Sequence, residues 1–77
     1  MKDYTPMDIY SPSGSKVRFE HSTDAQVSWG SHDDPDKHLE RGKTYTVLRT
    51  EVHSMHTKLY LREFPELKFN TCSFSNV

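Results

Sequence analysis

Two alternating apolar runs, separated by a short polar break, occupy the second half of this chain. The first run is Thr44–Val52 (TYTVLRTEV) and the second is Thr57–Phe64 (TKLYLREF). Both are rich in Thr, Tyr, Val, Leu and Phe, the residue types that fit a pleated, half-buried surface. The break, His53–His56, is short enough to close an antiparallel hairpin. These runs predict a small β-rich domain.

The charges in the two runs favour one register for this hairpin. If Glu51 faces Lys58, the two form a cross-strand pair of opposite charge that contributes roughly 0.2–1 kcal/mol. The same register places Arg49 opposite Tyr60 and Val52 opposite Thr57.

The remaining apolar residues of the hairpin indicate an irregularity. In a regular ladder Leu48 would pair with Leu61, and Tyr45 and Val47 would point away from the core. A β-bulge near Leu48–Arg49 returns both side chains to the core and adds the bend that a small barrel needs. We therefore expect a bulge there.

Shorter elements are predicted outside the hairpin. Alternation predicts one strand over Lys16–Glu20 and a second over Ala25–Trp29. A turn is expected over Phe64–Leu67, because Pro65 cannot donate to a central ladder. A single 3₁₀ turn is expected around Asn70–Cys72, followed by a last short strand.

The polar segment before the hairpin carries helix start and stop signals. Asp34 can cap a helix, Pro35 suits its first position, and Gly42 suits the position just past its end. These signals predict a short helix over residues 34–41, with Leu39 as its inward anchor.

About five short strands and one short helix describe an all-β, partly open barrel. The chain divides into a flexible N-terminal tail, residues 1–13, and a barrel domain, residues 14–77. The predicted core is Val17, Phe19, Val27, Leu39, Tyr45, Val47, Leu59, Leu61, Phe69 and Phe74.

Three segments carry a resemblance to known proteins: LERGKTYTV (39–47), LYLREFP (59–65) and FNTCSF (69–74). The chain resembles the SH3-like barrels, and specifically small uncharacterised SH3-like β-barrel proteins of bacterial and phage genomes. The resemblance spans about residues 14–75 and implies the fold. Because the acidic loop and the Tyr/Trp groove of peptide-binding SH3 domains are absent, it assigns no binding residue.

Charge and cysteine content narrow the possible functions. The 77 residues carry a net charge of -1, so no global positive field attracts nucleic acid or an anionic membrane. No apolar run approaches the ~20 residues that span a bilayer, and the first 15 residues do not form a signal peptide. Cys72 is the only cysteine, which favours a reducing, cytoplasmic setting.

No motif for catalysis or cofactor binding is complete. His53 and His56 are a weak candidate metal pair, but no second pair supplies the three or four ligands that zinc needs. The run Asp33–Asp36 lacks the spacing of a calcium loop, and helix capping explains it better. Cys72, set between two phenylalanines, is expected in the core rather than as a nucleophile. We expect a protein without a cofactor that is not an enzyme.

One strand face remains as a candidate binding surface. Lys58, Tyr60 and Arg62 point outward on one strand, and Arg49 can stack on Tyr60. Residues 41–68 contain six basic and three acidic residues, a local charge of +3. Such a face can bind single-stranded nucleic acid by stacking and phosphate neutralisation, although an ordinary solvated strand face has the same pattern.

Trp29 is the other candidate for a binding residue. A large aromatic residue next to a glycine can anchor a partner, although it more often fills the core. Taken together, the residues predict a non-catalytic binding module with a protein or peptide partner, such as an accessory or regulatory protein of a bacterium or phage. Single-stranded nucleic-acid binding is the alternative.

Overall fold

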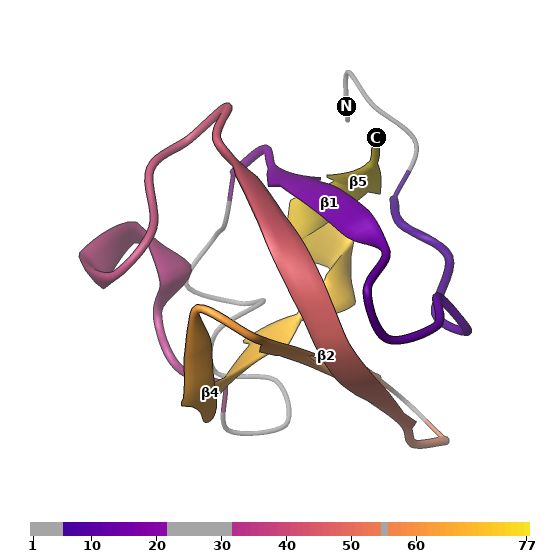
Figure 1. The fold of residues 1–77 in the computed structure, drawn as a ribbon. Coiled ribbons are helices and arrows are strands. Elements are labelled where there is room, and N and C mark those ends of the chain that lie inside the picture. Colours follow the sequence, from indigo (N-terminus) through magenta and orange to yellow (C-terminus); the bar gives the residue numbers. More distant parts are fainter. Residues whose placement is uncertain (1–5, 22–31, 55) are drawn as a thin grey trace.

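Five antiparallel strands make up one sheet in the computed structural model, which describes residues 6–21, 32–54 and 56–77 (Figure 1). The strands are β1 (Lys16–Phe19), β2 (Thr44–Val52), β3 (Thr57–Leu61), β4 (Phe64–Asn70) and β5 (Phe74–Asn76). Their order across the sheet is β4-β3-β2-β1-β5, and β2 runs as the long central strand. The expected all-β fold is confirmed.

The last two elements follow the order that the sequence predicts. A single 3₁₀ turn, η2 (Thr71–Ser73), separates β4 from β5, and the Asn70 side chain caps it by accepting a hydrogen bond from the Cys72 N–H. β5 then pairs with β1, with Phe74 opposite Phe19. The turn therefore carries the chain from one end of the strand order to the other.

The bulge in the β2–β3 hairpin is where it was expected. Arg49 faces Tyr60, but the next pair is Val47 with Leu61, so Leu48 is the extra residue on β2. The pairs Glu51–Lys58 and Val52–Thr57 also follow the predicted register. Because of this shift, Val47 is fully buried instead of pointing to solvent.

The core contains every predicted residue that the structure describes. Val27 and the predicted strand Ala25–Trp29 lie outside the described residues. Aromatic rings stabilise the centre, where the ring centroids of Phe19 and Phe74 are 5.5 Å apart. One residue was missed, Met7, which is only 3% exposed. The core is Met7, Val17, Phe19, Leu39, Tyr45, Val47, Leu59, Leu61, Phe69 and Phe74.

The predicted helix over residues 34–41 is wrong in length. Only one 3₁₀ turn forms, η1 (Pro35–Lys37), with the Asp34 side chain capping it as expected. The Glu40 N–H donates to the Tyr45 hydroxyl, 2.9 Å away, rather than to a helical carbonyl. This hydrogen bond to a residue five positions later replaces a helical one, and a helix of two turns has little cooperativity to resist it.

The predicted turn over Phe64–Leu67 is also wrong. The chain reverses before Phe64, in a two-residue loop at positions 62–63 that follows Leu61. Leu61 then pairs with Phe64 and Leu59 with Phe69, so the register shifts between these pairs and β4 contains extra residues there. Pro65 is accommodated because β4 is an edge strand, where the missing N–H costs no central ladder bond.

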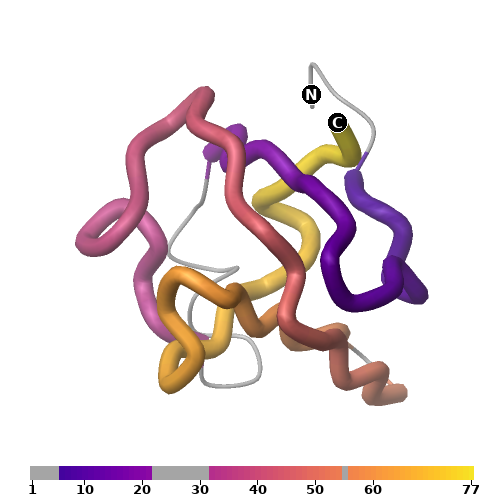
Figure 2. Tube along the Cα trace, in the orientation of Figure 1, coloured from indigo at the N-terminus to yellow at the C-terminus, as the bar shows by residue number. Residues whose placement is uncertain are grey.

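The segment predicted as a flexible tail packs on the sheet where it is described. The Met7 N–H donates to the Phe74 carbonyl, 2.8 Å away, and the Asp8 N–H donates to the Asn76 side chain. Figure 2 traces this segment, in indigo, beside the end of β5. The packed part of the domain therefore begins before residue 14.

Candidate binding face

Three of the predicted binding residues come together on the outer side of β2 and β3. The Arg49 guanidinium lies over the Tyr60 ring, 4.2 Å from its centroid. Lys58 precedes Tyr60 by two positions on β3, and alternate residues of a strand share a face. The residues between them are buried, so this face points outward. We call Arg49, Glu51, Lys58 and Tyr60 the β2–β3 face.

Glu51 lies at the centre of this face, a role that the sequence analysis missed. Its two carboxylate oxygens accept hydrogen bonds from the Arg49 guanidinium at 3.2 Å and from the Tyr60 hydroxyl at 3.3 Å. It was treated only as the cross-strand partner of Lys58. The available signal was its position two residues from Arg49 on the same strand, which places both side chains on one face.

Arg62 lies apart from the other three predicted residues. Its guanidinium bonds to the Ser13 hydroxyl at 3.3 Å, and its backbone N–H donates to the Thr46 carbonyl. Because Leu61 ends β3, Arg62 sits in the following loop. It reaches toward the segment before β1 instead of continuing the row of outward side chains.

The histidine pair closes the hairpin. The His53 N–H donates to the His56 carbonyl at 2.8 Å, and the two rings stack with centroids 4.9 Å apart at 24°. Imidazole lone pairs lie in the ring plane, so near-parallel rings do not direct them at a common ion. Within the described ranges, no group of three or more His, Cys, Asp or Glu residues could hold a metal ion.

The histidine pair also contacts His32 and Glu51. The ring of His32 packs edge-on against His56, with centroids 5.3 Å apart, and the His53 Nε2 atom lies 3.7 Å from Glu51. Burial, then the neighbouring His53 ring and the Lys58 ammonium, lower the pKa of His56. The surroundings of His56 at the hairpin end therefore favour the neutral form of its ring.

The acidic run near η1 has structural partners. The Asp34 carboxylate caps η1, Asp36 forms an ion pair with Arg41 at 3.0 Å, and the Asp33 carboxylate accepts from the Lys68 N–H at 2.9 Å. These bonds give each of the three carboxylates a structural role.

Cys72 is half-buried in η2, rather than in the core as expected. The 3₁₀ turn breaks the alternation between Phe69 and Phe74, and this break places the Cys72 side chain partly outside.

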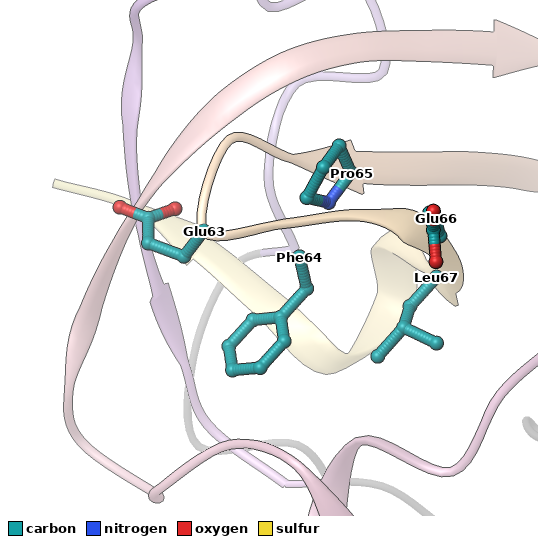
Figure 3. Close-up of a pocket in the computed structure, with 5 residues that line it drawn as sticks. All are labelled: Glu63, Phe64, Pro65, Glu66 and Leu67. Carbon is teal, nitrogen blue, oxygen red and sulfur yellow. The ribbon is translucent and has the colours of Figure 1, made fainter.

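A second surface feature lies on β4, where an open hollow of about 320 Å³ is lined by residues 63–67 (Figure 3). The side chains of Phe64 and Leu67 point to the same side of the strand and pack against the core. The Glu63 carboxylate is held by the Thr46 N–H, at 3.0 Å. Sequence reasoning missed this hollow because it assigned the segment to a turn.

Trp29 lies outside the described residues, so its predicted role has no structural counterpart. Among the residues that the structure describes, no helix has the length and apolar character needed to cross a bilayer. Comparison with protein families, with curated proteins and with solved structures finds no match for this chain.

Proposed function

We propose that this chain is a non-catalytic binding module that recognises a protein partner through the β2–β3 face. The observation that carries the proposal is the Arg49–Glu51–Tyr60 network, in which a half-buried aromatic ring is held in place on the outer side of two strands. Tyr and Arg are enriched among the residues that dominate protein interfaces. A side chain that is already ordered loses less entropy when a partner binds.

The charge arrangement of the face favours a protein over a nucleic acid. The carboxylate of Glu51 sits between Arg49 and Lys58, so positive and negative groups alternate. It partly neutralises the guanidinium and repels phosphate, whereas nucleic-acid binding requires cations that are free to replace counterions. A protein surface with an acidic group for Lys58 and a flat group over Arg49 complements this pattern.

The type of barrel, the cellular location and the biological role are part of the same proposal. The strand order β4-β3-β2-β1-β5, with a 3₁₀ turn before the last strand, supports an SH3-like barrel. A lone cysteine supports a reducing, cytoplasmic location. The resemblance to small bacterial and phage proteins supports an accessory or regulatory role.

Affinity capture from native lysate, with matched variants as bait, tests the proposal. We expect Tyr60→Ala to lose the captured protein, because it removes the ring that Arg49 covers. Lys37→Ala, an exposed substitution on η1, should retain it. Capture that is equal for both variants, or that disappears after nuclease treatment, would contradict the proposal.

Fluorescence anisotropy with short DNA and RNA oligomers at low salt tests the alternative. We expect no binding at ~100 μM, a concentration at which non-specific contacts are usually detectable. Binding with a log–log salt slope near -2, about -0.7 for each of three cationic contacts, would favour the nucleic-acid function instead. Loss of that binding in Tyr60→Ala would assign it to the same face.

A further inference from the structure

We propose that the stacked histidines at the hairpin end make the β2–β3 face sensitive to pH, because a cationic hairpin end draws Glu51 away from Tyr60. The inference rests on the proposed function only for the role of this face in binding. It concerns a conformational device within the chain itself, and its test needs no partner.

The device depends on one oxygen atom with two competing neighbours. Oε1 of Glu51 accepts from the Tyr60 hydroxyl at 3.3 Å and lies 3.7 Å from Nε2 of His53. The second oxygen, Oε2, accepts from Arg49 at 3.2 Å. When His53 is neutral, the phenol is the better donor to Oε1. When His53 is protonated, the contact becomes an ion pair between two charged groups, whereas the Tyr60 phenol remains a neutral donor.

The stacked arrangement adds repulsion at acidic pH. The rings of His53 and His56 are 4.9 Å apart, so two imidazolium charges would face each other. The ammonium of Lys58, whose charge already acts on His56, adds to the repulsion. The carboxylate of Glu51 lies 3.7 Å from Nε2 of His53, on the His53 side of the stack. The groups around the pair therefore favour a neutral stack and penalise a charged one.

The surroundings limit how the pair can relax. His32, which is 7% exposed, packs edge-on against His56 from the segment before η1. With that side occupied, the charged rings separate most readily by moving His53 outward, together with Glu51. Movement of Glu51 releases the Tyr60 hydroxyl and changes the β2–β3 face.

Nuclear magnetic resonance of the full chain between pH 8 and pH 5 tests this device. We expect the Tyr60 ring signals to shift with the same midpoint as the His53 ring signals. In His53→Gln the Tyr60 shift should disappear, and in Glu51→Gln it should disappear although both imidazoles remain. His38→Gln, a histidine substitution next to Phe64, is the matched control and should behave as the parent.

Thermal melting gives a second readout that does not depend on Tyr60. Between pH 7.5 and pH 5 the parent should lose a few degrees more of its melting temperature than His56→Gln, since the variant has no imidazole at position 56 to protonate beside His53 and Lys58. Tyr60 signals that stay fixed across this range, or that still shift in His53→Gln, would overturn the inference. If Tyr60 follows His53 but no protein is captured, the device stands and the proposed function fails.

Discussion

At the scale of single residues, Leu61 makes the clearest contribution to stability. Its side chain is fully buried on β3 opposite Val47, directly after the bulge. Leu61→Ala should cost about 2–5 kcal/mol in the free energy of unfolding, through lost burial and the cavity left behind. Urea denaturation measures this loss. Val52→Ala, on the same hairpin but 45% exposed, is the control and should change little. A Leu61→Ala variant that melts within a degree or two of the parent would mean that β3 faces the other way.

Glu63 is a residue whose charge contributes to the pH dependence of stability. Both carboxylate oxygens accept from the Thr46 N–H, at 3.0 and 3.2 Å, and Lys16 donates to the Thr46 hydroxyl beside them. Burial alone would raise the pKa of Glu63, but the hydrogen bonds from Thr46 outweigh it and the pKa is lowered. The folded state therefore favours the ionised carboxylate.

The lowered pKa of Glu63 predicts how the stability of the protein changes with pH. The stabilisation is complete above the unfolded-state pKa of glutamate, about 4.3, and is lost as the pH falls through the lower folded value. Glu63→Gln should make the fall in stability below about pH 4.5 less steep, because the amide does not take up a proton there. Urea denaturation between pH 3 and pH 7 measures the slope. Glu66→Gln, an exposed substitution on the neighbouring strand β4, should keep the slope of the parent, and an unchanged slope in Glu63→Gln would refute this account.

At the scale of elements, the register of the β2–β3 hairpin decides which of its side chains reach the surface. The bulge between Val47 and Arg49 buries one side chain and leaves the next paired residue outside, over Tyr60. A register without the bulge would place Val47 on the outer face. The same irregularity thus serves the core and the β2–β3 face.

A double-mutant cycle on Arg49 and Tyr60 measures the contact across this hairpin. We expect a coupling energy of about 0.5–1 kcal/mol for Arg49→Gln with Tyr60→Leu, the range for an exposed cation–π pair. The same cycle on Arg62 and Tyr60 is the control and should be near zero, since Arg62 bonds to Ser13. Equal coupling in both cycles would show that general charge, rather than the stacked contact, is being measured.

At the scale of the whole molecule, contacts from outside the sheet cover both of its edge strands. The Met7–Asp8 backbone bonds to β5, and the Asp33 N–H and carboxylate bond to the backbone of Lys68 on β4. Pro65 removes one more donor from the β4 edge. Exposed edges invite pairing with other chains, so these contacts favour recognition through side chains on the outer face over addition of a strand.

Far-ultraviolet circular dichroism checks the architecture as a whole. Five strands and two single 3₁₀ turns in the described part of the chain predict a β-type spectrum with little helical signal. We expect a helix content far below about a third, the average for globular proteins. A spectrum with more than about a third helix would contradict the fold.

The sequence by itself determined the features that depend on local pattern. Alternation at Val17 and Phe19 identified a strand and its buried face, and opposite charges at Glu51 and Lys58 identified a register. The bulge was predictable because only an extra residue buries Val47 together with Leu61. Each of these conclusions needs only the two-residue period of a strand and the cost of exposing apolar side chains.

Only the tertiary structure decided the features that depend on partners far apart in the chain. Met7 is buried because its backbone N–H donates to the carbonyl of Phe74, and the Asp33 carboxylate is held by the backbone N–H of Lys68. Glu51 becomes the centre of the candidate face through contacts on two strands. Local propensity carries no information about such contacts, since a hydrogen bond between distant residues forms only after the sheet has brought its two groups within reach.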